Sequence, residues 1–567
     1  MRGTLRVGDR LVVLAGAAVA GAAVAGALVV VPLIKLGQIM FEDGGSAIVR
    51  VLRAPGLGTA AVHTLLLACV VPLVAVPLGS AMALFLRRSD VPCRGLLRVA
   101  VVLPLIIPQF VLGYSWTQAY GRAGFTDSLL GLRWSGLNGP VGIAVVLVVD
   151  TAPLCYLLTM VGLATRAQPD LERAARLSGA GGWTTLRTVT LPLLRPVLAA
   201  EVVLTFIAAM ESFAVPQVLG ASSGFSTLTT RIYADLALAS DPESFLDAVT
   251  LALGLVLLAA VVLLPADLVL GPKLRAIRTA QPAGAVSTTG PSWRAVLPAV
   301  GVLGYTVLAV GLPTLALATT AITRSVGLPP TPSNWTLDNF RAALTGPTLD
   351  AVGNSLRLAA MAAFALTAFG ALVAALERRR AGRALGTLAI LTFAIPGSAL
   401  AVGLLIAYGR WLGGSLALIL VAYLAKFWAL AHRTLSGAVD RLPPAEWHAA
   451  RTSGAGPAVT VGTIWLPSLA PALLGAWVLV FLSALHEVTM SSLLYSFDSQ
   501  TLAVVVLNRQ ELGDIGATAA LSLSLTALLL ALALPSWLVL RLITRRRGGR
   551  PVGRVPSIAT PEVAGAG

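Results

Sequence analysis

The amino-acid sequence predicts an all-α integral membrane protein, built as two tandem halves of six transmembrane helices each. Three observations predict this fold class. The chain of 567 residues is 57% hydrophobic and 12% charged, whereas soluble proteins carry about 25% charged residues. Its apolar residues lie in long runs, and its mean hydropathy is +0.85. One loop motif occurs twice, at corresponding places in the two halves.

Composition also excludes several classes of protein. The charged content is too low for a soluble enzyme of this length, and the apolar content is too high for a disordered chain. Cys69, Cys93 and Cys155 are too few for a disulfide scaffold. The net charge of +16 would suggest nucleic acid in a soluble protein, but lysines and arginines collect in the cytoplasmic loops of membrane proteins. We therefore expect membrane lipid around the chain and no nucleic-acid partner.

Twelve apolar segments are long enough to cross a hydrocarbon core of about 30 Å, which requires roughly 20 helical residues. Helices are expected because backbone groups in lipid must be hydrogen-bonded within the segment or in a closed barrel. Barrel strands would be alternating segments of about 10 residues. The predicted segments are residues 11–34, 60–86, 96–118, 141–164, 193–216, 247–271, 295–320, 354–377, 385–408, 413–432, 469–489 and 516–540.

The distribution of basic residues predicts the orientation. Most lysines and arginines fall in the N-terminal tail, in alternate loops and in the C-terminal tail. Both termini are therefore expected in the cytoplasm of a multi-pass cell-membrane protein. The first segment follows Arg2, Arg6 and Arg10 and is too long for a signal core, which favours an uncleaved anchor. The basic residues at 541–547 indicate a stop anchor or, alternatively, contact with lipid headgroups.

A polar linker divides the chain near its midpoint. Residues 272–294 are basic and rich in Pro, Gly, Ser and Thr, which is typical of a linker. We expect a first half at 1–271, this cytoplasmic linker, a second half at 295–545 and a basic cytoplasmic tail at 546–567. Because each half has six spans, both copies share one orientation. This implies a pseudo-two-fold axis along the membrane normal.

The clearest internal repeat lies between segments four and five and again between segments ten and eleven. Residues 171–196 read LERAARLSGAGGWTTLRTVTLPLLRP, and residues 446–471 read EWHAARTSGAGPAVTVGTIWLPSLAP. A shift of 275 residues aligns Ala-Ala, Ser-Gly-Ala-Gly and Leu-Pro in the two copies. In the same way, HTLLLA (63–68) resembles NSLRLA (354–359). Self-similarity of this kind indicates a duplicated structural unit.

The repeated sequence predicts a specific local structure. The small residues before Ser-Gly favour a short helix that breaks at the glycine, which permits a left-handed turn. A second amphipathic stretch follows, and Pro192 and Pro467 suit the first turn of the next membrane helix. We expect a short helix lying across the cytoplasmic face and fixed to that membrane helix. An ordinary basic loop on lipid headgroups is the alternative, and it does not explain two copies with identical spacing.

The two copies resemble the EAA loop of binding-protein-dependent ABC importer permeases. That pattern is E-A-A, three residues, G, nine residues, I, one residue, L-P, and both spacings match it. The family's Glu is replaced by Arg173 and by His448, with Glu172 and Glu446 nearby. The first copy matches through Ala174, Ala175, Gly179, Leu191 and Pro192, and the second through Ala449, Ala450, Gly454, Leu466 and Pro467.

The resemblance covers most of the chain and implies partners. In the family, this loop docks into a groove of a cytoplasmic ATPase, and an extracytoplasmic binding protein delivers the substrate. The two fused halves, together with LPLIIPQFVLGYSW (103–116) and TLTTRIY (227–233), look like the ferric-iron subgroup. Fused permeases for thiamine, aminoethylphosphonate or polyamines look similar. The expected function is therefore the permease subunit of an ABC importer, with ferric iron as substrate and the other three as alternatives.

Several kinds of chemistry have no sequence support in this chain. No G-x-x-x-x-G-K-[ST] phosphate loop occurs, and neither H-E-x-x-H nor paired cysteines are present. We therefore expect no catalytic residues, no metal site and no cofactor in this chain, with ATP bound by a separate ATPase dimer. A membrane-embedded enzyme is disfavoured for the same reason. A proton-coupled secondary transporter with twelve helices in two halves remains an alternative class, although it has no need of the duplicated loop.

Ionisable residues within membrane segments are candidates for the translocation pathway, because such groups usually face the bundle interior or a wet cavity. The repeat shift aligns Glu211 with His486, next to Glu487, so two carboxylates are expected at similar depth, where they would suit a cation. Alternatively, they cap helix ends or pair locally. The further candidates, which either line the pathway or bond neighbouring helices, are Asp150, Glu201 and Lys426.

Overall fold

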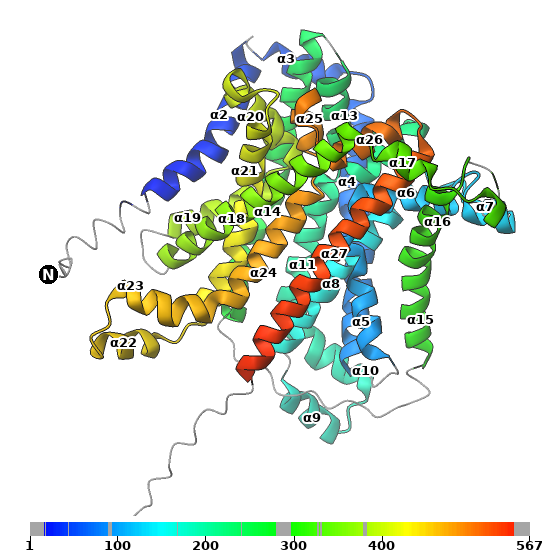
Figure 1. Ribbon diagram of the computed structural model, residues 1–567. Helices are drawn as coiled ribbons and strands as arrows, with labels where there is room; N and C mark the ends of the chain where they lie inside the picture. The colour runs from blue at the N-terminus through cyan, green and yellow to red at the C-terminus, as the bar shows by residue number, and fades with distance from the viewer. Residues whose placement is uncertain are drawn as a thin grey trace, which may run out of the picture.

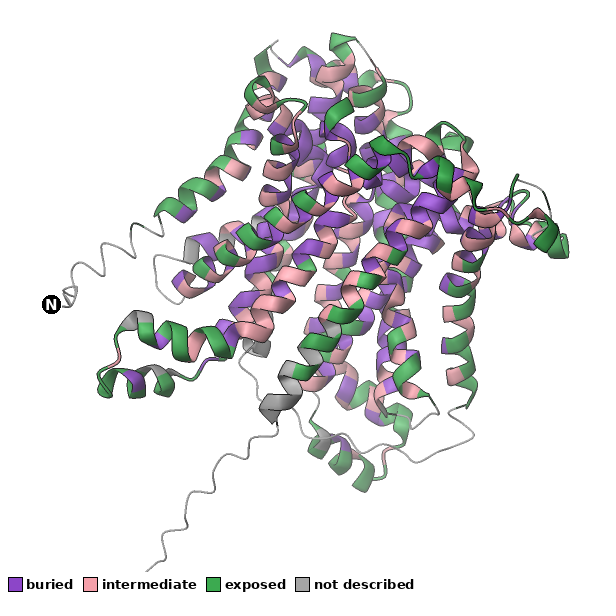
Figure 2. Cartoon of the chain, viewed as in Figure 1, coloured by how far each residue is buried: buried purple, intermediate pink, exposed green. Residues whose placement is uncertain are grey.

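The computed structural model describes residues 16, 19–42, 45–88, 93–166, 168–239, 241–278, 296–325, 328, 331–377 and 383–548. Within these ranges the chain is helical, and its single β-bridge joins Thr323 to Trp335. Ten of the described helices are long and apolar enough to cross a membrane. They form one bundle in which buried side chains fill the centre and exposed side chains lie at the periphery (Figures 1 and 2).

The first half consists of helices joined by short turns. Its elements are η1 (Gly26–Val30), α2 (Val31–Glu42), α3 (Ser46–Arg53), α4 (Leu57–Arg88), α5 (Arg94–Val102), η2 (Leu103–Ile106), α6 (Gln109–Tyr120), α7 (Phe125–Leu130), α8 (Pro140–Arg166), α9 (Pro169–Leu177), α10 (Gly182–Thr185), η3 (Leu186–Thr190), α11 (Leu191–Glu211), α12 (Ala214–Gly220), η4 (Ala221–Ser223), α13 (Leu228–Tyr233), η5 (Ala234–Leu238) and α14 (Pro242–Arg278).

The second half repeats this order. Its elements are α15 (Val296–Thr306), η7 (Val307–Gly311), α16 (Leu312–Ile322), η8 (Pro332–Asn334), α17 (Asp338–Ala343), α18 (Gly346–Glu377), α19 (Arg383–Ala394), α20 (Gly397–Leu412), α21 (Leu416–Asp440), α22 (Pro444–Thr452), α23 (Pro457–Thr460), η10 (Val461–Trp465), α24 (Leu466–Leu485), α25 (Ser491–Leu494), η11 (Phe497–Ser499), α26 (Leu502–Glu511) and α27 (Ile515–Gly548).

Two of the predicted spans are broken rather than continuous, which corrects the segments at 96–118 and 385–408. In the first half, Arg94–Ile106 and Gln109–Leu130 meet at a bend of 105°. In the second half, α19 and α20 are separated at Pro396, whose ψ is 140°. Pro108 and Pro396 occupy the same place in the two halves. Both lack an N–H group and disfavour helix at the residue before them, which explains why both spans break there.

Other predicted boundaries also move. The first span continues to Glu42, beyond the predicted end at residue 34, and residues 11–15 of that prediction lie outside the described residues. The segments predicted at 193–216 and 469–489 end early, because α11 stops at Glu211 and α24 stops at Leu485, and each is followed by a separate short helix. Helix α14 continues to Arg278, inside the predicted linker. The rest of the linker and most of the predicted tail lie outside the described residues.

The first span of each half packs against the other half. Helix α2 contacts α20 and α21 contacts η1, while α16 contacts α6. Each of these first spans contains a π-helical turn, η1 or η7, whose carbonyls receive hydrogen bonds from the opposite half. Tyr408 Oη donates to Ala27 O at 2.6 Å, Tyr120 Oη to Leu308 O at 2.6 Å and Trp116 Nε1 to Ala309 O at 3.0 Å. The two halves are therefore interlocked in a reciprocal way.

Small residues allow neighbouring helices to approach closely within each half. A Cβ atom on Gly79 of α4 would lie 2.4 Å from Ala152 O of α8, and one on Gly370 of α18 would lie 3.0 Å from the Ala431 carbonyl carbon of α21. Close backbone approach at small residues is the usual way in which membrane helices gain packing contact. The corresponding helix pairs, α4 with α8 and α18 with α21, thus pack closely at a glycine in both halves.

Candidate translocation pathway and repeated loops

The two copies of the sequence repeat form matching loops at one end of the bundle. We call residues 169–190 the first repeated loop and residues 444–465 the second repeated loop. Their helices α9 and α22 both lie toward the lower end in Figure 1, opposite α3, α13 and α26. We call the lower end the loop end. The two loops extend away from the centre of the bundle, and many of their residues are exposed (Figure 2).

Both short helices end in the same hydrogen-bonded turn, which confirms the predicted break at glycine. Gly179 has φ +86° and Gly454 has φ +78°. In the first loop Gly179 N donates to Arg176 O and Ala180 N to Ala175 O, and in the second loop the residues 275 positions later make the same two bonds. This pair of bonds is the Schellman motif, which needs a left-handed residue after the helix.

The second limb of each loop continues directly into a membrane helix. Gly182–Glu211 forms one continuous helix of 30 residues, and both limbs contain a π-helical turn, η3 or η10, just before Leu-Pro. Pro192 and Pro467 are the second residues of α11 and α24, but in the first loop the predicted start of the membrane helix at Leu-Pro is wrong, because that helix already begins at Gly182. The amphipathic stretch predicted to end at Leu-Pro therefore continues into α11 without a break in the first loop.

The side chains of the repeated loops divide into an inward and an outward set. Glu172 is buried, and its Oε1 accepts a hydrogen bond from Thr190 Oγ1 at 2.8 Å, which ties α9 to η3. Arg173 is exposed and pairs with Asp170 at 3.2 Å. The outward set includes Leu177 and Trp183, which are 89% and 72% exposed. Exposed apolar side chains of this size commonly mark a contact surface.

The remaining residues of the resemblance occupy the same kinds of position. Ala175 is half-buried and Ala450 is buried. The residues that face outward are Ala174, Glu446, His448 and Ala449. The positions that the resemblance implied therefore come together on two surface loops, and the replacement of the family's Glu by Arg173 and His448 leaves both of those side chains exposed.

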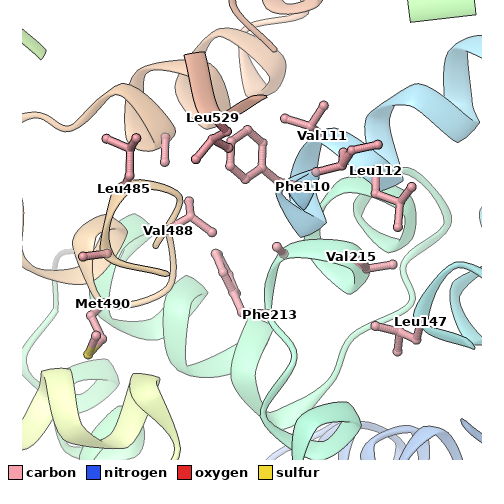
Figure 3. Close-up of a cluster of buried hydrophobic side chains, with 14 of the residues drawn as sticks. Phe110, Val111, Leu112, Leu147, Phe213, Val215, Leu485, Val488, Met490 and Leu529 are labelled. Carbon is pink, nitrogen blue, oxygen red and sulfur yellow. The ribbon is translucent and has the colours of Figure 1, made fainter. Parts of the chain in front are cut away.

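An apolar cluster closes the centre of the bundle where α11 and α24 end. Phe213 and Val488 follow these helices at positions related by the 275-residue shift, and they are 2% and 5% exposed. Side chains of α6, α24 and α27 surround them, including Phe110, Leu485 and Leu529 (Figure 3). Because both halves contribute to it, this cluster, which we call the central plug, joins the two halves across their interface.

Charged residues lie beside the central plug. Glu211, the last residue of α11, pairs through Oε2 with Lys426 Nζ of α21 at 2.7 Å. The same ammonium group donates to Ile395 O at 2.8 Å, at the break between α19 and α20. The ion pair therefore connects the first half to the broken span of the second half. A charged pair is costly to bury in a membrane and commonly has a functional role.

Glu487 and His486 differ from Glu211 in their contacts, although the shift aligns them with it. The Glu487 carboxylate accepts from Met490 N at 2.6 Å, Ser491 N at 3.0 Å and Ser491 Oγ at 2.8 Å, so that it caps α25. His486 Nδ1 is buried and has no hydrogen-bond partner among the described residues. Of the predicted alternatives, helix capping describes Glu487 and local pairing describes Glu211. Both residues lie beside the plug. Their role in the pathway stays a prediction.

Glu201 and Asp150 bond neighbouring helices. Glu201 is fully buried and accepts from Thr159 Oγ1 at 2.7 Å and from Ser80 Oγ at 3.2 Å, so that α11 is tied to α8 and α4. Asp150 accepts from Gln109 Nε2 at 2.7 Å and holds the start of α6 beside the Pro108 break. These contacts match the hydrogen-bonding interpretation of both residues.

The other recurring motifs meet at the end opposite the loops. Thr64 of HTLLLA accepts a hydrogen bond from Leu228 N of TLTTRIY at 2.9 Å. In the second half, Ser355 of NSLRLA accepts one from Leu502 N at 2.8 Å. The motif at 103–116 contains the Pro108 break. Each sequence repeat thus corresponds to a repeated tertiary contact.

One polar cluster between the halves was not predicted from the sequence. Glu511 of α26 accepts hydrogen bonds from Gln217 Nε2 at 3.0 Å and from Tyr233 Oη at 3.3 Å. Partial burial of the carboxyl raises the pKa of Glu511 above its usual value, against the lowering effect of these two bonds, although the residue as a whole is exposed. Tyr233 ends the motif TLTTRIY, but Gln217 and Glu511 belong to no motif. Because Glu511 is far from both partners in the chain, only the tertiary structure brings them together.

Comparisons with known proteins place this architecture among transport proteins. The chain matches the family described as binding-protein-dependent transport system inner membrane component over residues 75–271 and 366–549, once in each half. It is 26% identical over 554 residues to the ferric transport system permease protein FbpB of Actinobacillus pleuropneumoniae, which covers 93% of this chain and 78% of that protein.

Two further relatives show how the match extends. The probable ABC transporter permease protein y4fN of Sinorhizobium fredii is 27% identical over 526 residues, covering 88% of this chain and 90% of that protein. The molybdenum transport system permease protein ModB of Mycobacterium tuberculosis is 33% identical over 215 residues, which is 38% of this chain and 80% of that protein. The molybdenum permease therefore aligns with less than half of this chain.

Proposed function

This chain belongs to the family of binding-protein-dependent transport system inner membrane components, and from that premise we propose that it is the fused permease subunit of an ABC importer for ferric iron. The observation that carries this proposal is the pair of repeated loops, which share their spacing, their positive-φ glycine and their hydrogen bonds. One such loop in each half provides one docking element for each subunit of an ATPase dimer. The chain itself is a transport subunit rather than an enzyme.

The repeated loops can transmit force to the pathway. The first loop is tied by Glu172 and Thr190 to a helix that runs without interruption from Gly182 to Glu211. Thirty helical residues span about 45 Å, so a displacement of the loop moves Glu211 and the adjoining Phe213 at the other end. ATP binding by the partner would draw the two loops together. The transport cycle then requires two bundle states that bind the ATPase dimer unequally.

The central plug serves as the barrier in this proposal. Phe213 and Val488 close the interface between the halves with apolar side chains, next to Glu211 and Glu487. Separation of α11 from α24 would open this barrier, and the carboxylates beside it would favour a cation. Asp150 and Glu201 hold the surrounding helices in place.

The finer topology is part of the same proposal. Counting each broken span once gives twelve membrane crossings, and the reciprocal packing of α2 and α16 supports a pseudo-two-fold axis along the membrane normal. We place the repeated loops and both termini in the cytoplasm of a cell-membrane protein, with the first span uncleaved. The extracytoplasmic binding protein would dock at the opposite end, near α3, α13 and α26. ATP would bind only to the partner subunits.

Ferric iron is the substrate that the relatives support. The first of those compared is a ferric transport system permease aligned over 93% of this chain, whereas the molybdenum permease aligns with 38% of it. Thiamine, aminoethylphosphonate and polyamines are the competing substrates within the same importer class. A proton-coupled secondary transporter would leave the two repeated loops without a purpose.

The test is uptake of radioactive ferric citrate by cells of the native host that lack this chain and are complemented with it. We expect uptake only in complemented cells, with loss on depletion of ATP and persistence when the proton gradient alone is collapsed. Competition by excess thiamine, aminoethylphosphonate or spermidine should leave iron uptake unchanged. Uptake that follows the proton gradient, or complementation that restores another substrate but not iron, would reject the proposal.

A further inference from the structure

An apolar cavity of about 610 Å³ lies between the two halves at the side of the bundle. One wall is formed by α4 and α8 of the first half, and the other by α15 and η7 of the second half. In Figure 1, α15 stands at the edge of the bundle. All of these elements belong to helices long and apolar enough to cross a membrane. The cavity, which we call the side cavity, therefore has a wall from each half and lies at membrane depth.

The lining of the side cavity is apolar. Apart from Trp116 and Tyr305, its residues are leucine, valine, alanine and proline. The polar atoms of these two aromatic residues donate hydrogen bonds to backbone carbonyls, Trp116 Nε1 to Ala309 O at 3.0 Å and Tyr305 Oη to Val149 O at 3.4 Å. An apolar cavity of this kind binds apolar molecules rather than water, and its volume lies within the roughly 300–1,000 Å³ that is usual for ligand pockets.

The side cavity is elongated along the helices. Leu66, Val70, Val74 and Leu78 follow one another at every fourth position of α4 and so form a stripe on one face of that helix. From Leu66 to Leu78 the stripe rises about 18 Å, which is close to the roughly 15 Å of hydrocarbon in one leaflet. Val141, at the start of α8, also lines the cavity and is exposed, so the cavity opens toward the surrounding lipid. This shape fits one extended acyl chain.

One end of the side cavity adjoins residues 131–139, which lie opposite the loop end. Pro140 lines the cavity and directly follows this segment as the first residue of α8. Within the segment, the ring of Trp134 lies 6.3 Å from the ring of Trp116, and the neighbouring Arg133 is exposed. Tryptophans are enriched at the membrane interface, and the arginine guanidinium is well suited to phosphate. An arginine is thus available where the headgroup of a lipid in the cavity would lie.

The local charge favours an anionic headgroup. Over residues 121–139, Arg122 and Arg133 outnumber the single acidic residue, Asp127. Helix α7 lies within this segment, and its Leu129 and Leu130 are exposed, which is typical of a helix at the membrane interface. Basic residues close to the membrane surface attract anionic lipids.

We propose that the side cavity binds one acyl chain of an anionic phospholipid, whose phosphate is held by Arg133. The lipid belongs to the leaflet opposite the loop end. Its chain fills the space between α15 and the first half and supplies the dispersion contacts that an unfilled cavity lacks, so it stabilises the packing of the two halves. The site does not depend on the transported substrate, and this inference can therefore fail while the proposed function stands.

The test is photolabelling of the full chain in lipid nanodiscs. The bilayer is phosphatidylcholine with a trace of phosphatidylglycerol that carries a diazirine in its acyl chain, and labelled residues are identified by mass spectrometry. We expect labels on the cavity lining. Ala144→Phe fills the cavity from a buried position of α8 and should reduce this labelling about tenfold, which corresponds to 1.4 kcal/mol. Val161→Phe, at an exposed position of α8 outside the lining, is the matched control and should label as the unmodified chain does.

Two further variants complete the test. Val145→Phe narrows the same cavity from a half-buried position, so it repeats the measurement if Ala144→Phe does not fold. Arg133→Gln should abolish the preference for phosphatidylglycerol over phosphatidylcholine with the same diazirine, which we expect to be about fivefold in the unmodified chain. Labelling of the lining that persists in a folded phenylalanine variant would show that only the surrounding lipid is labelled. That result, or equal labelling of the unmodified chain by the two lipids, would overturn the inference.

Discussion

Glu172 and Thr190 are joined by a hydrogen bond of 2.8 Å that ties the loop helix α9 to the base of the helix ending at Glu211. The bond joins the two limbs of the first repeated loop, and Glu172 is buried although it belongs to a surface loop. A loop held in this way moves with its membrane helix as one unit.

Glu172→Ala should weaken coupling between the ATPase and the bundle. Loss of a buried hydrogen-bond acceptor leaves Thr190 less well paired and costs about 1–3 kcal/mol locally. We expect ferric uptake to fall several-fold while the amount of chain in the membrane is maintained, as measured by uptake normalised to immunoblot. Arg341→Ala, which removes an exposed side chain of α17 outside both repeated loops, is the control, and an equal effect of both variants would contradict this role.

Gly179→Val combined with Gly454→Val should abolish uptake. Both glycines have positive φ, and a β-branched residue there is strained by roughly 1–2 kcal/mol at each site. The strain would unwind the turn that positions each loop helix. The matched control is Gly181→Val with Gly456→Val, since neither of those glycines has positive φ and an added Cβ would meet no atom within 4 Å. Normal uptake by the first double variant would show that the turn is dispensable.

Glu201→Leu should destabilise the protein, whereas Glu201→Gln should transport normally. Leucine removes the acceptor of two buried hydroxyl groups, Ser80 and Thr159, at a cost of about 1–3 kcal/mol for each unsatisfied group. Glutamine retains one acceptor oxygen, and the two hydroxyls also bond each other at 3.0 Å. Thermal unfolding in detergent measures the first effect. Uptake per folded molecule measures the second, and its loss in Glu201→Gln would assign Glu201 to the pathway instead.

Glu511 should make the protein less stable as the pH rises from acid toward neutral. Burial raises the pKa of its carboxyl above the ordinary 4.5, so the folded protein binds this proton more tightly than the unfolded chain does. Its stabilising contribution is complete below the unfolded pKa and is lost as the pH rises through the folded pKa. Thermal unfolding midpoints of Glu511→Gln should therefore vary less with pH in this window than those of the unmodified chain.

Asp338→Asn provides the control for the pH experiment. The hydroxyl of Thr336 and the guanidinium of Arg341 hold the pKa of Asp338 below its ordinary 3.8. The stabilising contribution of this carboxylate is therefore complete above the unfolded pKa and is lost only as the pH falls through the folded pKa. Its removal should leave the slope above pH 4.5 unchanged. If Glu511→Gln shows the same slope as the unmodified chain, the carboxyl contributes nothing to the pH dependence.

The sequence allowed the membrane class, the duplication and the repeated loops to be predicted because each depends on local chemistry. Long apolar runs require helices in lipid, and the Ser-Gly turn depends on a glycine at one position. The broken spans were missed because the apolar runs continue through Pro108 and Pro396, and a proline within a membrane helix is often tolerated. The continuity of α10 with α11 was missed because a π-helical turn accommodates Pro192 without ending the helix.

Sequence alone determined that this chain is a duplicated membrane bundle with two equivalent loops, because hydropathy, spacing and glycine positions are written in consecutive residues. Only the tertiary structure decided which charges meet. Glu211 and Lys426 are 215 positions apart and lie in different halves, and Gln217 is 294 positions from Glu511. Such pairs form because the interlocked halves bring the end of α11 against α21 and α12 against α26, and packing between distant helices has no local signature.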